Sequence, residues 1–308
     1  MLTKKCGFAV RFMVFLFSGL VFGQNDLSDF LLNGKVKDVQ SVTVKFDNQS
    51  YTTVSGFLDS ENFDSVYLKF DSKGNLIIHK NYLDYQGKLG LFDRTVYRFN
   101  FNNRIEKSET ELIQNGEEPR KISQRKKFYY IQNQLARIDE FNSGRTTDQF
   151  WVTNLIYEGG RLTRKDFWME DAVFSRTEFT NRLYQVTSEK TFHNDGKVGR
   201  LVSYKYDENA KLILKSTQSG NELTEETFAY KNEKLKTHTA KSDGKLIFNE
   251  LYNGHGLPES IEKFNYRTRK PDLYEFNFEY DFQNNWINCV ILENQKPRFV
   301  IKRKISYY

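Results

Sequence analysis

The chain has 308 residues, with 46 Lys and Arg against 40 Asp and Glu, and 16% of its residues are aromatic. Removing residues 1–23, which carry three Lys or Arg and no Asp or Glu, leaves 43 basic residues against 40 acidic ones. A charge so nearly balanced argues against nucleic acid as a partner. Only Cys289 lies beyond that segment, which excludes an internal disulfide; the pattern around it predicts a buried, inert thiol.

Residues 1–23 have the layout of a signal peptide. Lys4, Lys5 and Arg11 form a basic region, residues 12–22 are apolar, and Val21 and Gly23 suit a cleavage site before Gln24. The alternative, a membrane anchor, is disfavoured because the apolar run is shorter than the ~20 residues of a spanning helix. The sequence therefore predicts an exported protein of the periplasm, cell surface or extracellular space.

The first segment of the mature chain, Asn25–Gly34, has the pattern of a short helix. Asp26 or Ser28 can cap it and Gly34 suits its C-terminal end. We expect this helix to cover one end of a sheet. Val42, Val44 and Phe46 then alternate with polar residues and predict the first strand.

A short unit recurs from there to the C-terminus: alternating aromatics, a polar turn, then an aliphatic residue. Its clearest copy is Tyr274–Trp286, where five aromatics alternate with polar residues before the turn at 283–285. Another is a hairpin in which Asp71–Asn75 supplies the turn and Gly74 the positive φ. The units predict an all-β fold: a long twisted or curled antiparallel β-meander of repeated hairpins with a short N-terminal helix. Residues 24–308 form one domain, since no linker divides them.

The repeated unit resembles a known family. The Y-x-Y-D-x-x-x-x-L pattern at Tyr204–Leu212 and the F-D-x-K-G-N-L pattern at Phe70–Leu76 are similar to YD/RHS-type repeats of secreted bacterial proteins. The resemblance implies a repetitive β-sheet in or outside the cell envelope. It carries no catalytic residues over to this chain.

No motif in the sequence points to catalysis or to a cofactor. His79, His193, His238 and His255 lie outside metal-ligand spacing, so we predict no metal site. The turn Asp71–Asn75 lacks the acidic spacing of a calcium loop. The acidic pairs Glu225-Glu226 and Glu170-Asp171 could serve a glycosidase, although solvated strand faces explain them more simply.

The three tryptophans are candidates for a sugar-stacking surface. Trp286 follows the clearest strand, and its pattern favours the core. Trp151 and Trp168 lie among polar residues, which makes exposure more plausible for them. The basic runs Arg125–Lys127 and Lys302–Lys304 are interpreted as solvated strand faces.

Three functions are compared on this basis. The preferred one is a non-catalytic envelope module that binds an envelope protein or polysaccharide. An enzyme acting on envelope glycans through paired carboxylates is the alternative. An outer-membrane barrel is disfavoured, because positions alternating back from Tyr308 are Ser306, Lys304 and Lys302, and the other register meets Arg303. The mature chain is thus not expected to span a membrane.

Overall fold

The computed structural model describes residues 30–45, 63–85, 88–113, 122–143 and 148–308. These residues form twenty β-strands in one sheet. The strands are β1 (Val36–Lys45), β2 (Ser65–Phe70), β3 (Leu76–Tyr85), β4 (Lys88–Phe99), β5 (Ile105–Leu112), β6 (Ile122–Ile131), β7 (Gln134–Ser143), β8 (Asp148–Glu158), β9 (Arg161–Met169), β10 (Ala172–Arg182), β11 (Gln185–His193), β12 (Val198–Tyr206), β13 (Leu212–Ser219), β14 (Glu222–Lys231), β15 (Lys234–Ser242), β16 (Lys245–Tyr252), β17 (Pro258–Asn265), β18 (Lys270–Tyr280), β19 (Trp286–Glu293) and β20 (Lys296–Tyr307).

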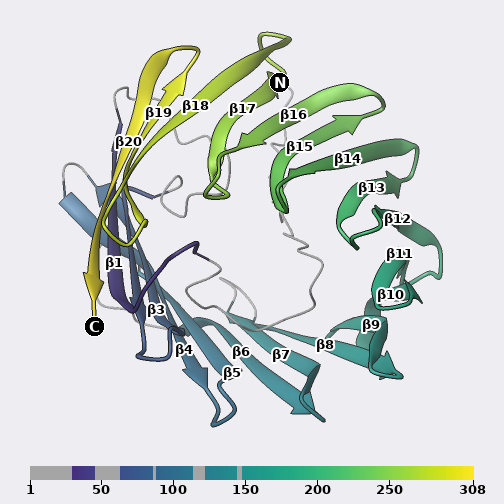
Figure 1. The fold of residues 1–308 in the computed structure, drawn as a ribbon. Helices are drawn as coiled ribbons and strands as arrows, with labels where there is room; N and C mark the ends of the chain where they lie inside the picture. Colours follow the sequence, from purple (N-terminus) through teal and green to yellow (C-terminus); the bar gives the residue numbers. More distant parts are fainter. Residues whose placement is uncertain (1–29, 46–62, 86–87, 114–121, 144–147) are drawn as a thin grey trace, which may run out of the picture.

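The sheet closes on itself. Each strand pairs antiparallel with its neighbours in sequence, and β1 pairs with β20 from Val36–Tyr307 to Lys45–Phe299. Figure 1 shows the resulting ring of strands, with the first and last strands side by side. The expectation of a long twisted or curled antiparallel β-meander is therefore wrong, because the strands form a closed barrel. Closure satisfies the backbone groups that two edge strands would leave unpaired.

The expected helix over Asn25–Gly34 is also not supported. Residues 25–29 lie outside the described residues, and Phe30–Gly34 form turn and irregular structure without a helix. Gly34 has φ +79°, the conformation expected of it, but it ends an irregular segment that leads into β1. The side chain of Leu32 packs against Val36, Phe70 and Leu76, and this tertiary contact competes with a local helix.

The recurring motif of the sequence is a turn motif. Five connections have the same five-residue turn, in which the first side-chain oxygen accepts hydrogen bonds from the backbone N–H groups two and four residues later. The first residues of these turns are Asp71, Asn100, Asp207, Asn253 and Asp281, each preceded by Phe or Tyr. Gly74, at φ +90°, confirms the predicted positive φ in the first of them.

The side chains on the two faces of the barrel wall differ in how far they are buried. In β12, Val202 and Tyr204 are buried, whereas Leu201, Ser203 and Lys205 on the other face are exposed. A curved sheet crowds the side chains on its concave side. The segment before β1 bends into the ring in Figure 1, and it packs against the more buried face. The more buried face is therefore the inner one.

The two ends of the barrel differ in the length of their connections. At the end where β1 begins and β20 stops, all nine connections, from β2–β3 to β18–β19, have two or five residues. At the opposite end, eight of the ten connections have two or four residues, and the other two, β1 to β2 and β5 to β6, have 19 and nine. We call these the short-turn end and the long-loop end.

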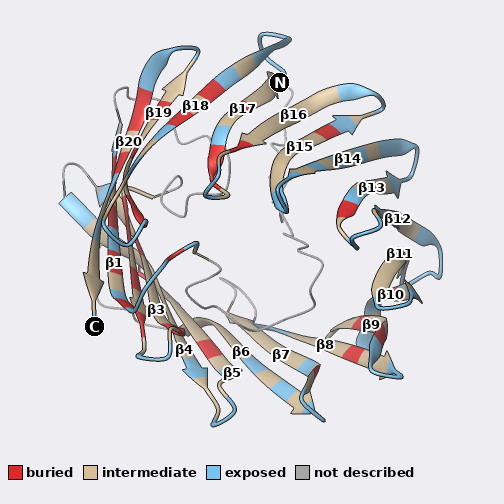
Figure 2. Ribbon diagram, in the orientation of Figure 1, coloured by how far each residue is buried: buried red, intermediate tan, exposed pale blue. Residues whose placement is uncertain are grey.

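Burial concentrates where the first and last strands meet. Figure 2 shows more buried positions in β17–β20 and β1–β3 than in β10–β16. The largest cluster surrounds Ile291 and Ile301, both fully buried. It includes Trp286, 2% exposed, and Cys289, 0% exposed, which confirms both predictions of core positions. The Cys289 thiol has no exposed surface at which to react.

Candidate functional site

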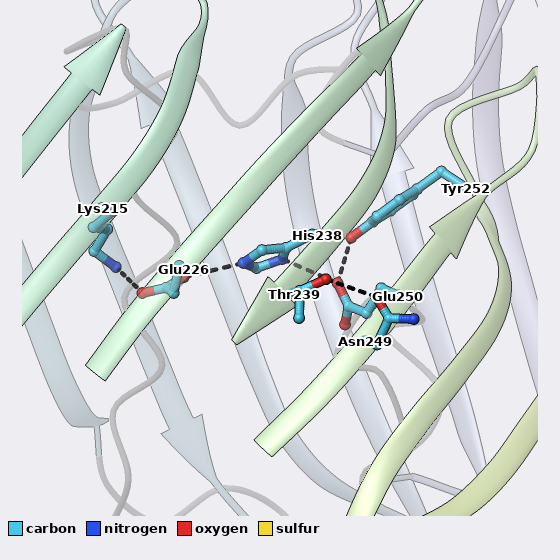
Figure 3. A network of polar contacts seen from close by, with 7 residues as sticks. All are labelled: Lys215, Glu226, His238, Thr239, Asn249, Glu250 and Tyr252. Atoms are coloured by element: carbon cyan, nitrogen blue, oxygen red, sulfur yellow. Dashed lines mark hydrogen bonds and ion pairs between the residues drawn. The ribbon is translucent and has the colours of Figure 1, made fainter. Parts of the chain in front are cut away.

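Charged side chains follow one another along the inner face of β13–β16. Lys215 Nζ lies 2.5 Å from Glu226 Oε1, and Glu226 Oε2 lies 3.1 Å from His238 Nε2. His238 Nδ1 lies 3.1 Å from Glu250 Oε2, which also accepts a 2.5 Å hydrogen bond from the Tyr252 hydroxyl. These side chains come from β13, β14, β15 and β16, and Figure 3 shows their contacts. We call these five residues the inner charged row.

The row is largely covered by its neighbours. The side chains of Lys215, Glu226, His238 and Glu250 are between 12% and 20% exposed. The His238 ring stacks on Phe228, with centroids 4.5 Å apart, and meets the edge of Phe248 at 4.9 Å. Two rings and two carboxylates therefore hold the imidazole in one position, where it bridges Glu226 and Glu250.

A second polar contact continues in the same direction round the wall. Tyr204 lies opposite Lys215 in the ladder, and its hydroxyl donates a 2.5 Å hydrogen bond to Glu189 on β11. The inner wall from β11 to β16 thus presents paired acids and bases with tyrosine hydroxyls. Such a surface suits contact with water and polar solutes. The side chains of this surface hydrogen-bond to one another. A catalytic nucleophile, by contrast, is paired with a base that is free to accept its proton.

The structure separates the two tryptophans proposed as a stacking surface. Trp151 is paired with Met169 and Trp168 with Val152, so the two indoles lie on opposite faces of the wall. Both are half-buried, and Trp151 packs edge-on against Phe167 at 5.9 Å. No single flat platform is formed by the two rings.

The acidic pairs are likewise divided. Glu226 lies on the inner face, while Glu225 is exposed on the outer face opposite Lys241. Glu170 and Asp171 form the turn between β9 and β10. Glu225 and Glu226 thus do not share one site, as a glycosidase would require, and Glu170 and Asp171 are exposed in their turn.

Residues of the two basic runs form ion pairs or lie against an aromatic ring. Arg125 pairs with Glu109 at 2.9 Å and Lys126 with Glu140 at 3.1 Å, on opposite faces. Arg303 lies over the Trp286 ring, 3.4 Å from its centroid. Within the described ranges, no group of three His, Cys, Asp or Glu residues could hold a metal ion.

The inner charged row was missed by the sequence-based search for sites. Its signal is a regular spacing, because Glu226, His238 and Glu250 are each separated by 12 residues. That spacing reflects three successive strands joined by two-residue turns, which places the three side chains on one face. Recognising it requires the register of both hairpins, which the sequence does not state.

Comparisons with known proteins identify no relative by sequence. No family model matches the chain, and no curated protein matches it. Among solved structures, a porin-like protein from Bacteroides uniformis aligns with 89% of this chain and 98% of its own, at 8% identity and a TM-score of 0.38. A porin-like protein from Bacteroides vulgatus aligns over the same shares, at 13% identity and a TM-score of 0.27.

The resemblance to YD/RHS repeats is corrected by the fold. The aromatic–Asp pairs are accounted for by the five-residue turns of a closed barrel, and β1–β20 pairing leaves no open repeat sheet to extend. The interpretation as an envelope β-repeat module with a protein or polysaccharide partner depended on such a sheet and is withdrawn with it. Large closed antiparallel barrels are an architecture of exported envelope proteins.

The expectation that the mature chain does not span a membrane is also corrected. It rested on the residues that alternate back from Tyr308, but a barrel closes through backbone pairing, whatever side chains its last strand carries. No helix in the described part of the chain is both long and apolar enough to cross a membrane.

Proposed function

We propose that this chain is an outer-membrane β-barrel of a Gram-negative bacterium, with a water-filled lumen through which small polar solutes pass. Closure carries the proposal: twenty antiparallel strands, connected in sequence order, end with the last strand paired to the first. Single-chain outer-membrane barrels have an even number of such strands, and barrels of 16–18 strands already leave an aqueous channel. Passage of solutes requires no catalytic group.

The two longer connections, which lie at one end of the barrel, support the same function. Outer-membrane barrels have short turns on the periplasmic side and longer loops outside. Here the short-turn end also holds the start of β1 and the end of β20. We therefore place the short-turn end in the periplasm and the long-loop end outside the cell.

The inner charged row gives the lumen a chemical character. Its acids and bases lie within reach of one another, so the row presents both signs of charge over a short distance. A wall of this kind suits small hydrophilic solutes over strictly anionic or strictly cationic ones.

Charges on the outer face oppose insertion into lipid. Arg94 lies 2.6 Å from Glu111 and Arg176 lies 3.0 Å from Asp166, both on the face opposite the inner row. The same face exposes apolar residues: Val44, Leu201, Leu223 and Leu273. An unpaired Arg or Lys at the bilayer midplane costs about 2–4 kcal/mol, so cross-strand pairing is a condition for insertion.

Membrane extraction and conductance test the proposal. The full chain, expressed in a Gram-negative host, is expected to stay in the outer-membrane fraction after washing with alkaline carbonate and with urea. Purified in detergent, it is expected to produce stepwise conductance in a planar bilayer. Recovery of the folded mature chain in buffer without detergent would overturn the proposal. A variant that lacks β20 (residues 296–308) serves as the control, because it cannot close and should give no channel.

A further inference from the structure

A short segment of the chain is held inside the ring by one side chain. The carboxamide of Asn285, 1% exposed, accepts a 2.6 Å hydrogen bond from Asn33 N–H and donates a 2.9 Å bond to Asn33 C=O. It thereby pairs with both backbone groups of Asn33, as a neighbouring strand would. Asn33 adds a bond of its own from Nδ2 to the carbonyl of Asn284, at 3.3 Å.

The Asn285 side chain is itself fixed by the wall. Its Nδ2 donates a 2.7 Å hydrogen bond to the Tyr307 hydroxyl, and that hydroxyl donates to Asp281. Asp281 in turn accepts from the backbone N–H of Asn285, at 2.9 Å. The last strand, the β18–β19 turn and the segment before β1 therefore meet at one amide.

Packing supports the segment on one side only. Leu32 is 7% exposed within the cluster of Val36 and Phe70, and the Phe30 ring meets Phe70 edge-on at 5.8 Å. On the other side, a cavity of about 250 Å³ separates residues 31–33 from Trp286 and Tyr280. The segment is thus held by the Asn285 carboxamide and by the apolar packing of Leu32 and Phe30, with a cavity beside it.

The equivalent turn of another hairpin shows that this grip is particular to Asn285. Asn75 occupies the same last position of its five-residue turn and is 2% exposed. Its carboxamide pairs with the side chain of Asn103 in the adjoining turn, at 2.6 and 3.0 Å. Asn75 thus joins two turns of the wall, whereas Asn285 holds a separate segment.

We propose that residues 30–34 form an internal stopper at the short-turn end of the barrel, and that Asn285 is the latch that retains it. Figure 1 shows this segment bending from the foot of β1 into the ring. Breaking the latch frees the segment to move into the adjacent cavity and leaves the wall intact. The proposal concerns the mouth of the barrel and extends the proposed function.

Hydrogen exchange of the peptide containing residues 30–35 tests the latch in the full chain. The Asn33 amide is expected to be protected in the unmodified protein. Asn285→Ala removes its acceptor, and exchange of this peptide should become about ten- to hundredfold faster. Peptides from β18–β20 should be unchanged. Tyr307→Phe, which removes only the hydroxyl that orients Asn285, should act in the same direction and less strongly.

Asn75→Ala is the matched control, since it deletes the same carboxamide from the same turn position without touching the segment. Equal exchange at residues 30–35 in Asn285→Ala and the unmodified chain would overturn the latch. If Asn285→Ala does not fold, the Tyr307→Phe result decides instead.

Conductance separates this inference from the proposed function. A latched stopper predicts that Asn285→Ala channels stay open longer than unmodified ones, and equal open times would overturn the stopper. If neither protein conducts, the proposed function fails, while the exchange result still decides whether the segment is latched.

Discussion

Tyrosine rather than phenylalanine stands before several turns for a reason visible in the contacts. The hydroxyls of Tyr130, Tyr206 and Tyr230 each donate a hydrogen bond of 2.8–3.0 Å to a backbone carbonyl on the preceding strand. The acceptor lies at the first or second residue of that strand, beside its turn. Each ring thus buries apolar area while its hydroxyl satisfies a carbonyl near the barrel rim. The pattern of aromatics is visible in the sequence, but these partners are not.

The inner charged row is the residue-scale feature most open to test. His238→Ala removes two hydrogen bonds and leaves Glu226 and Glu250 without that partner inside the wall. We expect the free energy of unfolding to fall by about 1–3 kcal/mol, because partly buried carboxylates lose a donor. Equilibrium denaturant titration of the folded barrel measures this loss.

The control is the next residue on the opposite face. Thr239→Val deletes a single 2.7 Å hydrogen bond to Asn249 and should cost less. Equal losses for the two variants would show that the row adds nothing beyond an ordinary cross-strand contact.

At the scale of the element, turn chemistry explains most of the hairpins. Asp207 and Asp281 cap five-residue turns, and two-residue turns such as Asn232-Glu233 have positive φ at both residues. These were predictable, because Asp, Asn and Gly favour such turns. The turn Leu183-Tyr184 was not, since Leu183 adopts φ +56° without being a residue that favours it. The ladder between β10 and β11 imposes the conformation there.

Leu183 therefore carries local strain that a substitution can release. Its side chain is 72% exposed, so little packing is lost by truncation. Leu183→Gly should raise the free energy of unfolding by about 1 kcal/mol, since glycine adopts positive φ without the steric cost. Thermal or denaturant unfolding measures the change. Leu183→Val, branched at Cβ, should lower stability, and the prediction fails if both substitutions act in the same direction.

Closure is the property of the whole molecule on which the fold and the proposed function depend. Val44 on β1 and Val300 on β20 are directly paired on the outer face. With Val44→Cys and Val300→Cys introduced together, mild oxidation should link the two ends of the chain within one molecule. The native Cys289 is fully buried and should not compete. A shift in mobility on non-reducing electrophoresis, confirmed by mass spectrometry, detects the link.

A second pair of cysteines is the control, which shows that the disulfide forms only between directly paired strands. Val290 on β19 is paired with Val300, so Val44→Cys with Val290→Cys places the thiols two strands apart. Two strand spacings, about 9.6 Å, exceed the reach of a disulfide. Cross-linking of both pairs, or of neither, would contradict the closed register.

The β-strands, their turns and the packing of Trp286 follow from local pattern, because side-chain alternation and turn-forming residues act over a few neighbours in the chain. Whether the strands remain an open sheet or close into a barrel depends on contacts between residues far apart in the sequence. Closure depends on pairing between Val36–Lys45 and Phe299–Tyr307, which are separated by nearly the whole chain. The same register brings Glu226, His238 and Glu250 together, divides Trp151 from Trp168, and places Asn33 against Asn285. These contacts are set by long-range register, and residues close in sequence do not encode it.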